Sequence, residues 1–398
     1  MFNPEFSVFD DWMFGKLTKL LDGINPSKSL EHINLSLGEP QLEPPLILQK
    51  SIQQHSSDWK KYSPAGGTKS FREAVANYLL RRYPKTKKIN DLDNLITPVP
   101  GTRAPLYQVG SMLRNSSLEK KYSLVTNPFY HAWRAGALAS GNKIHWMNAV
   151  KEKNWLPDLK NIDQNILKQT SIMYLCTPSN PQGTSASLSW LVQAIETCRK
   201  HNILLCVDEC YADIYRNFTN PPVGSLEAIN EIDDGFSNVL IFHSLSKRSS
   251  AAGLRAGFIL GDENIIRMYR KLIANGGVTV SLPQLKAAEA LYNDDQHVIK
   301  TRDYYDRNFE ISKNFLNAPI PNGGFFHFIE VNDDINAAKH LWKNYGIKTM
   351  PGSFMAQETK EGNPGRGYLR LALVHNAEVT QKALSRVSSG LEEIQCNS

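Results

Sequence analysis

Short apolar, β-rich runs recur between about residues 70 and 260, and segments with a helical pattern separate them. The runs are YSLVT (122–126), SIMYLC (171–176), ILLCV (203–207) and NVLIF (238–242). Continuous apolar runs of this length are typical of strands buried on both faces, which favours a parallel sheet. Between two of them, the apolar residues of 187–200 keep helical spacing, with Ser187 as a candidate N-cap. This alternation predicts an α/β fold with a mainly parallel sheet flanked by helices.

The pattern changes after about residue 295. The elements expected there are a helix over 301–316, a β-rich segment over 323–331, a helix near 334–345, a strand over 368–374 and a final helix near 377–394. We therefore predict a large domain over 46–294 and a smaller α+β domain over 295–398. Residues 1–45 show no regular pattern and are Pro-rich near their end, and we expect this segment to pack with the smaller domain.

Length and composition agree with this division and exclude some classes of protein. A chain of 398 residues suggests about two domains. The net charge of +6 is spread along the chain, so nothing indicates nucleic-acid binding. No run approaches 18 consecutive apolar residues, and the first residues lack the pattern of a signal peptide. We therefore expect a cytoplasmic protein with no membrane segment.

The cysteines support the same compartment. Their number is odd, and Cys176 and Cys206 fall in the apolar runs, as expected for reduced thiols. Cys206 and Cys210 have CxxxC spacing, but neither a second pair nor a nearby histidine completes a zinc site. We expect no metal.

Polar or aromatic residues follow each predicted strand directly. In open α/β sheets, ligands lie at the carboxyl ends of the strands, so these residues together predict one shared pocket. In strand order they are Tyr130, then Asn180, then Asp208 and Tyr211, and finally Ser244, Ser246 and Lys247.

Taken singly, each of these residues also allows a structural interpretation. Asp208 ends an apolar strand and needs a partner: it is either half of a structural ion pair, a helix cap, or a carboxylate that holds a proton on a heterocyclic nitrogen. Asn180 precedes a proline and suits a plain turn, and Tyr130 and Tyr211 suit ordinary packing. Lys247 lies in a Ser-rich loop, where a lysine is a solvated residue, a phosphate contact or a nucleophile.

Two further groups of residues suit a phosphate. Ser244, Ser246 and Arg255 together can bind a dianion, although a Ser-rich loop is also a common solvated turn. The segment PGTRAPLY places Gly101, Thr102 and Arg103 at a loop-to-helix junction, where backbone N–H groups favour an anion. Nucleotide-binding alternatives lack their motifs: GGTKS (66–70) does not have the order GxxxxGK[ST], and no GxGxxG follows a strand.

These residues, in this order, resemble a known family. SLSKRSSAAGLRAG is similar to the S-x-S-K-x-x-x-x-x-G-x-R-x-G signature of fold-type I, pyridoxal phosphate (PLP)-dependent aminotransferases of class I/II. The resemblance runs from LSLGEP (35–40) to YLRLALV (368–374), and includes Asn180-Pro-x-Gly, Asp208-x-x-Tyr211 and Arg370. It implies the PLP-transferase fold, the cofactor PLP, small amino-acid and 2-oxo-acid substrates, and a homodimer.

The resemblance also implies a role for each matched position. Lys247 would carry the cofactor covalently and, once released, shuttle protons as a base. Asp208 would pair with the pyridinium nitrogen, Asn180 and Tyr211 would bind the phenolic oxygen, and Tyr130 would stack on the ring. The other implied contacts are Gly101, Thr102, Arg103, Ser244, Ser246 and Arg255 on the phosphate, Tyr62 on the phosphate of the neighbouring subunit, and Arg370, Gly38 and Asn180 on the substrate.

A narrower resemblance points to a substrate. SKRSSAAGLRAGF, together with MPGSFMAQETKEGNPGRGYLRLALV (350–374), is similar to segments of bacterial succinyldiaminopimelate aminotransferases, which act in lysine and diaminopimelate biosynthesis. Ala104 departs from the acidic residue expected after GTR. Arg366 is a candidate contact for distal carboxylates, and a turn-stabilising arginine is an equal alternative. The alternative activities are another aminotransferase of the class (aspartate, aromatic or LL-diaminopimelate type) or a PLP β-lyase.

The resemblance places Lys247 beside the cationic ring of the cofactor and beside Arg255. Two nearby positive charges are expected to lower the pKa of this lysine.

An effector-sensing regulator of the same fold is disfavoured, because only about 34 residues precede LSLGEP.

Overall fold

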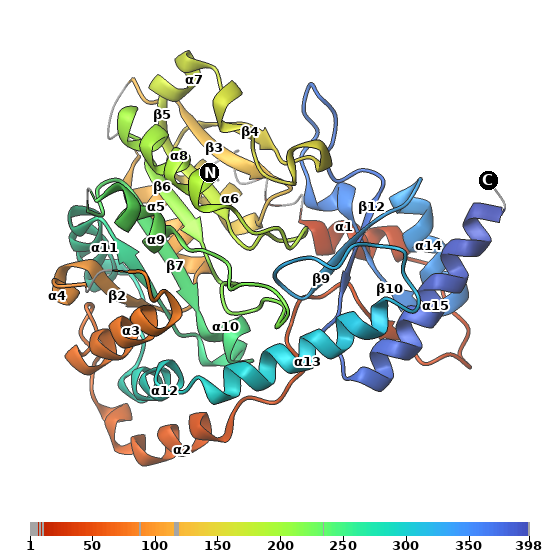
Figure 1. Ribbon diagram of the computed structural model, residues 1–398, viewed down its shortest axis with the longest axis horizontal. Coiled ribbons are helices and arrows are strands. Elements are labelled where there is room, and N and C mark those ends of the chain that lie inside the picture. The colour runs from red at the N-terminus through yellow and green to blue at the C-terminus, as the bar shows by residue number, and fades with distance from the viewer. Residues whose placement is uncertain are drawn as a thin grey trace.

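The computed structural model describes residues 7, 9, 12–86, 89–114, 119–233 and 235–396. Figure 1 shows two layered regions, a large one around a wide twisted sheet and a smaller one that contains the C-terminal helix. No helix in this part of the chain is long and apolar enough to cross a membrane. The expected cytoplasmic location stays a prediction.

The large sheet has seven strands in the order β2-β8-β7-β6-β5-β3-β4. All pairs among β7, β6, β5, β3 and β4 are parallel, whereas β8 is antiparallel to both β7 and β2. The predicted mainly parallel sheet is therefore confirmed. The strands are β2 (Ile96–Val99), β3 (Tyr122–Asn127), β4 (Lys143–Asn148), β5 (Thr170–Cys176), β6 (Leu204–Asp208), β7 (Val239–Ser244) and β8 (Gly257–Gly261).

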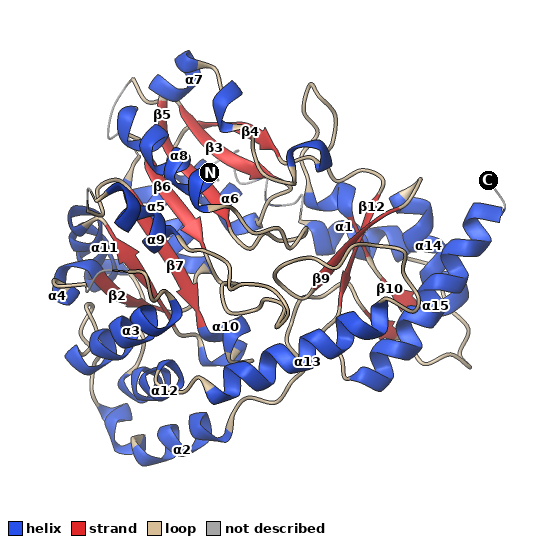
Figure 2. Cartoon of the chain, in the orientation of Figure 1, coloured by secondary structure: helices blue, strands red, loops and turns tan. Residues whose placement is uncertain are grey.

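Helices cover both faces of this sheet (Figure 2). Alternate residues of a strand face opposite sides, and here they join two separate apolar clusters, one with Met173 and Leu205 and the other with Ile172 and Leu204. Helices α3 (Lys69–Arg82), α8 (Leu188–Lys200), α9 (Ser225–Ile232) and α12 (Leu282–Tyr292) contribute to the first cluster. Helices α5 (Arg103–Met112), α6 (His131–Ala139) and α11 (Glu263–Gly276) contribute to the second.

Local signals explain several helix starts. Ser187 caps α8, because its Oγ accepts a hydrogen bond from the Trp190 N–H at 3.2 Å. This matches the predicted N-cap. The remaining helices of the large region are α2 (Leu46–Gln54), α4 (Leu92–Leu95), α7 (Gln164–Lys168) and α10 (Leu245–Arg248).

The smaller region is built on a three-stranded antiparallel sheet of order β11-β12-β9. Helix α13 (Gln296–Ser312) runs from beside α12 toward this region (Figure 1), and it starts and ends earlier than the predicted 301–316. Its early start follows Asp294, whose carboxylate accepts from the Gln296 N–H at 2.8 Å. The other elements are β9 (Phe326–Glu330), α14 (Asp334–Tyr345), β11 (Met350–Pro351), β12 (Tyr368–Ala372) and α15 (Ala377–Cys396).

The N-terminal segment is more regular than the sequence indicated. Helix α1 (Met13–Leu21) buries Leu17 and Leu21 against Met350 and Met355. Strand β1 (Ile33–Asn34) pairs in parallel with β10 (Ile347–Lys348). The expectation of an irregular segment was wrong for these residues, although they do pack on elements of the smaller region. Residues 1–6, 8, 10 and 11 lie outside the described part of the chain, and the domain bounds stay a prediction.

Candidate active site

A cavity of about 500 Å³ lies at the carboxyl ends of β5, β6 and β7. Most of the residues predicted for the pocket line it, and they come from strand ends, from the start of α5 and from the smaller region. The predicted residues in its wall are Gly38, Thr102, Arg103, Tyr130, Asn180, Asp208, Tyr211, Ser244, Ser246, Lys247, Arg255 and Arg370. The sheet edge thus brings together positions that are far apart in the sequence.

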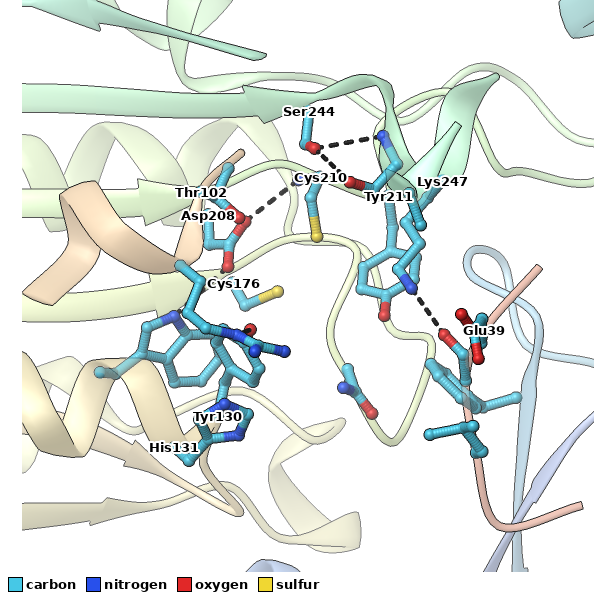
Figure 3. A pocket seen from close by; sticks show the side chains of 18 of the residues that line it. Glu39, Thr102, Tyr130, His131, Cys176, Asp208, Cys210, Tyr211, Ser244 and Lys247 are labelled. Carbon is cyan, nitrogen blue, oxygen red and sulfur yellow. Dashed lines mark hydrogen bonds between the residues drawn. The ribbon is translucent and has the colours of Figure 1, made fainter. Parts of the chain in front are cut away.

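Lys247 projects into this cavity from the short helix α10, directly after β7 (Figure 3). Its Nζ donates a hydrogen bond to the Gly38 carbonyl at 2.6 Å and lies 5.5 Å from the ring centre of Phe325. Burial lowers the pKa of Lys247 to about 8, and the nearby guanidinium groups of Arg370 and Arg103 act in the same direction. The expected direction is correct, but burial is the main cause and Arg255 is not among the causes.

Asp208 ends β6 and is buried against the cavity wall. Its two carboxylate oxygens accept hydrogen bonds from the Cys210 N–H at 3.3 Å and from Trp133 Nε1 at 3.4 Å. Burial raises the pKa of Asp208 to about 6. Both direct donors are neutral, so the site leaves this carboxylate suited to a cationic partner that enters the cavity.

Tyr130 and Arg103 form a contact that the sequence did not indicate. Arg103 Nε donates to the Tyr130 hydroxyl at 3.1 Å. Burial raises the pKa of this phenol, so the hydroxyl accepts the bond as a neutral group. The pair joins the first turn of α5 to the residue that precedes α6, on the side of the cavity that Figure 3 shows with Thr102 and His131.

The residues that the sequence predicts to bind a phosphate lie close together. The Ser244 hydroxyl accepts from the Ser246 N–H at 3.2 Å and donates to the Ser246 hydroxyl at 2.9 Å, and Arg255 Nη1 lies 3.5 Å from that hydroxyl. Gly101 does not line the cavity itself, but it adopts φ of +73°, and a Cβ there would lie 2.2 Å from Arg255 Nη2. Only glycine leaves room for the guanidinium at this position.

Arg370 reaches the cavity from β12 and is almost fully buried. Its Nη1 donates to Asn180 Oδ1 at 3.1 Å, and its Nη2 donates to the Ser36 carbonyl. Among the described residues its Nε has no hydrogen-bond partner. Arg370 also lines the cavity, and a buried guanidinium beside a cavity suits a carboxylate ligand. Gly38 is packed too tightly for a side chain, since a Cβ would lie 2.5 Å from the Phe326 ring.

Several wall residues were missed by the sequence analysis. Trp133 follows Tyr130 by one helical turn, and Cys210 follows Asp208 by two residues, so both lie near predicted positions without a motif of their own. Burial raises the pKa values of Cys176 and Cys210 well above the ordinary range, which keeps both thiols protonated. The wall residues outside the prediction are Met13, Phe14, Leu37, Glu39, His131, Trp133, Cys176, Cys210, Ala252 and Phe326.

Three other residues named from the sequence lie outside the cavity wall. Tyr62 is fully exposed, and its contact with a neighbouring subunit stays a prediction. Arg366 is exposed and donates to Glu358 at 2.8 Å, so it does not reach the cavity. Ala104 is partly buried in the first turn of α5, which contains no acidic residue.

The geometry fits PLP in three respects. Asp208 offers a buried carboxylate for a protonated ring nitrogen, the Ser244–Ser246–Arg255 group offers donors for a phosphate, and Lys247 offers a primary amine with a lowered pKa. The pyridine ring of PLP would also have an aromatic neighbour in Tyr130, which lines the same cavity. The cavity can therefore hold the cofactor that the sequence predicts.

Comparisons with known proteins agree. A profile of the family "Aminotransferase class I and II" matches residues 31–387. The curated LL-diaminopimelate aminotransferase of Dehalococcoides mccartyi is 27% identical over 380 residues, which cover 91% of this chain and 92% of that protein.

Two solved structures are more similar. An aminotransferase of Neisseria meningitidis is 31% identical with a TM-score of 0.91, over 96% of this chain and 97% of that one. Aminotransferase AspB of Helicobacter pylori is 31% identical with a TM-score of 0.88, over 98% of this chain and 99% of that one. The family match spans most of the chain, and the family depends on PLP. The chain is a member of the class I and II aminotransferase family, and PLP is its cofactor.

Proposed function

We propose that this aminotransferase acts on N-succinyl-LL-2,6-diaminopimelate. In the proposed reaction, the amino group passes to 2-oxoglutarate, which gives N-succinyl-2-amino-6-oxopimelate and glutamate, and the reaction is reversible. Such an enzyme would serve lysine and diaminopimelate biosynthesis. The proposal goes beyond the transaminase activity that family membership establishes.

The observation that carries this proposal is the position of the two segments that resemble succinyldiaminopimelate aminotransferases. The first contributes Lys247 and Arg255 to the cavity wall, and the second contributes Arg370. The second segment also contacts the chain next to a cavity residue, because the Met355 carbonyl accepts from the N–H of Phe129 at 3.0 Å, one residue before Tyr130. Both segments therefore adjoin the space where a substrate would lie.

The proposed roles follow from the contacts. PLP, when bound, supplies the electron sink that stabilises a negative charge at the substrate Cα. Asp208 would hold the ring nitrogen in its protonated form, and Asn180 and Tyr211 would donate to the phenolic oxygen. Thr102, Ser244, Ser246 and Arg255, with the Gly101 backbone, would hold the phosphate.

On the substrate side, Arg370 would bind the α-carboxylate through its guanidinium group. The Lys247 amine, neutral above a pH of about 8 and partly neutral below it, would take a proton from the substrate Cα and return it to the neighbouring carbon of the cofactor. Such general acid–base help typically contributes about 10²–10⁴-fold. Tyr130 would cover one face of the ring.

We also propose a homodimer with shared active sites. The residue that supports this is Tyr62, which is fully exposed and lies outside the cavity wall of its own chain. A side chain in this position is available to a second copy of the chain, as the family resemblance implies.

A second candidate substrate is LL-diaminopimelate without the succinyl group. The observation that favours it is the set of curated relatives, which includes LL-diaminopimelate aminotransferases at 24–27% identity over more than 90% of the chain. The two candidates share the amino acid end and differ at the distal nitrogen, which is an amide in one and an ammonium group in the other.

A comparison of substrates tests the proposal. The purified PLP enzyme receives 2-oxoglutarate with N-succinyl-LL-2,6-diaminopimelate, LL-diaminopimelate, N-acetylornithine, aspartate or an aromatic amino acid, and glutamate formation is measured. We expect the highest kcat/KM for the succinylated substrate. A higher kcat/KM for LL-diaminopimelate would establish the second candidate. Activity confined to the remaining amino acids would refute both and leave the cofactor assignment intact.

The pH dependence of cofactor uptake tests the state of Lys247. The neutral amine is the nucleophile that attaches PLP, and the pKa of Lys247 is about 8. The protonated amine predominates below that pH, so the rate at which apo-enzyme takes up PLP is expected to rise about tenfold per pH unit below pH 8 and to level off above it. The measurement is stopped-flow absorbance between pH 6 and 10.

The control for this experiment is the reaction of PLP with a simple amine over the same pH range, with its rate divided by the concentration of the neutral amine, which corrects for titration of the cofactor itself. After that correction, a rate that keeps rising to pH 10 would show that the Lys247 amine behaves like an exposed lysine, and the buried, low-pKa environment would be refuted.

A further inference from the structure

Directly after Lys247, the chain turns an arginine away from the cavity into the interior. Arg248 is almost completely buried. Its Nε donates to Asp213 Oδ2 at 2.9 Å, its Nη1 donates to the Leu291 carbonyl at 2.7 Å, and its Nη2 donates to Asp295 Oδ1 at 3.1 Å. One residue of α10 thus faces the cavity, while the next donates hydrogen bonds to several acceptors on the opposite side.

Asp213 is the centre of this arrangement. Its Oδ1 accepts from Arg82 Nε at 3.1 Å, and its Oδ2 accepts from the Tyr78 hydroxyl at 2.8 Å in addition to Arg248. Burial alone raises the pKa of Asp213, but the charges of Arg248 and Arg82 outweigh it and hold the pKa below its ordinary value. We call Arg82, Asp213 and Arg248 the buried triad.

The position of Asp213 along the chain connects the buried triad to the residues of the cavity. Asp213 lies two residues after Tyr211 and five after Asp208, in a segment folded into successive turns. In those turns the Ala212 N–H donates to the Glu209 carbonyl at 2.9 Å, and the Ile214 N–H donates to the Tyr211 carbonyl at 2.9 Å. The Arg248–Asp213 pair is therefore a direct link between the segment that carries Lys247 and the segment that carries Asp208 and Tyr211.

Both arginines of the buried triad have further contacts that hold them in place. The Arg248 guanidinium lies 4.8 Å from the Tyr78 ring centre, and the next residue, Ser249, is 2.8 Å from His297 Nε2 through its hydroxyl. Arg82 donates in addition to the carbonyls of Ala212 and Pro222 at 2.8 Å. A planar guanidinium that serves several acceptors restricts both position and orientation, which a lysine ammonium does not.

We infer that the buried triad positions Lys247 relative to Asp208, so that the amine and the carboxylate meet opposite ends of the same cofactor ring. Arg248 and Asp213 touch neither substrate nor cofactor and act through their neighbours, as positioning residues. This inference rests on the proposed roles of Lys247 and Asp208. Misplacement of reacting groups by about 1 Å costs on the order of 10²-fold in rate, so a loosened link has a measurable effect.

The test uses Arg248→Met, Arg248→Lys and Asp213→Asn. We expect the Kd of apo-enzyme for PLP to rise on the order of 10²-fold in Arg248→Met and Asp213→Asn, and kcat with L-glutamate as amino donor to fall by a similar factor. The KM for L-glutamate is expected to change less than about threefold, because Arg370 is untouched. Arg248→Lys, which keeps the charge but not the fork of donors, is expected to show a smaller loss in the same direction.

The matched control is Arg81→Met. Arg81 precedes Arg82 on α3 and pairs with Asp295 at 2.7 Å, but it is partly exposed and does not contact Asp213. We expect its PLP Kd and kcat within about threefold of wild type. Far-UV circular dichroism and the melting temperature of each apo-enzyme show whether it folds. If Arg248→Met does not fold, Arg248→Lys carries the test.

Two results would overturn the inference. The first is that the Arg248 and Asp213 variants have a lowered melting temperature but the PLP Kd and kcat of wild type. The triad would then have a purely structural role. The second is that Arg248→Met and Asp213→Asn change the PLP Kd and kcat no more than Arg81→Met does. Lys247→Ala is measured alongside: if it keeps turnover, the proposed role of Lys247 fails, whereas unchanged Arg248 variants with an inactive Lys247→Ala enzyme refute only the positioning role.

Discussion

Replacing Lys247 by alanine is expected to abolish transamination and to remove the visible absorbance of the bound cofactor. Among the described residues, Lys247 is the one lysine in the cavity wall, and we propose for it both the covalent attachment of PLP and the proton transfer. Loss of the proton transfer alone costs about 10²–10⁴-fold, and loss of the attachment adds to it. The measurements are the absorbance spectrum of the PLP-loaded protein and glutamate formation in the substrate comparison.

The matched control for Lys247→Ala is Lys286→Ala. Lys286 is a partly buried lysine on α12 that pairs with Glu289 at 2.9 Å and does not line the cavity. Its variant is expected to keep the visible band and most of the activity. Wild-type turnover in Lys247→Ala, with a melting temperature like that of wild type, would show that another group performs the chemistry and would end this assignment.

Replacing Asp208 by asparagine is the second change with a large expected effect. Asparagine has nearly the same shape but no charge, so the ring nitrogen would lose the anion that keeps it protonated. Removal of one preorganised electrostatic partner typically lowers kcat by about 10²–10³-fold. We expect a loss of this size, with PLP still bound through Lys247 and a visible band still present.

The control for Asp208→Asn is Trp133→Phe, which removes one hydrogen bond to the carboxylate and keeps its charge. That contact is long, at 3.4 Å, so the expected loss is less than about tenfold. If both variants lost activity equally, the hydrogen-bond geometry around Asp208 would matter more than its charge, and the assigned role would be wrong.

Much of the large region could be predicted because its strands are buried on both faces. The runs that end at Cys176, Val207 and Phe242 fall within one or two residues of β5, β6 and β7. The functional side chains follow these strands directly, so finding the strand ends also located Asp208 and Lys247. The argument from continuous apolar runs works here because helices cover both faces of the sheet, so most residues of these strands are apolar.

Other features depended on contacts between distant segments. Helix α1 packs against Met350 and Met355 of the smaller region. Its N-cap residue, Trp12, makes no side-chain hydrogen bond, so no capping residue marks the start of this helix in the sequence. Cys176 and Glu39 also line the cavity, but Cys176 belongs to no motif and Glu39, although it lies in LSLGEP, was given no role. The contact between Arg103 and Tyr130 likewise joins the first turn of α5 to the residue that precedes α6, 27 positions away, which no local pattern encodes.

The reversed direction of β8 has a consequence for how the site assembles during folding. Because β8 is antiparallel to β7, with Ser244 opposite Gly257, the proposed phosphate-binding residues Ser244, Ser246 and Arg255 all belong to one local strand-to-strand connection. Closing such a short connection costs little chain entropy, whereas Arg370 must be brought in across more than a hundred residues. We therefore expect these three residues and Lys247 to reach their places early, with the β7–β8 pair, and Arg370, the proposed carboxylate ligand, to arrive only when the smaller sheet docks.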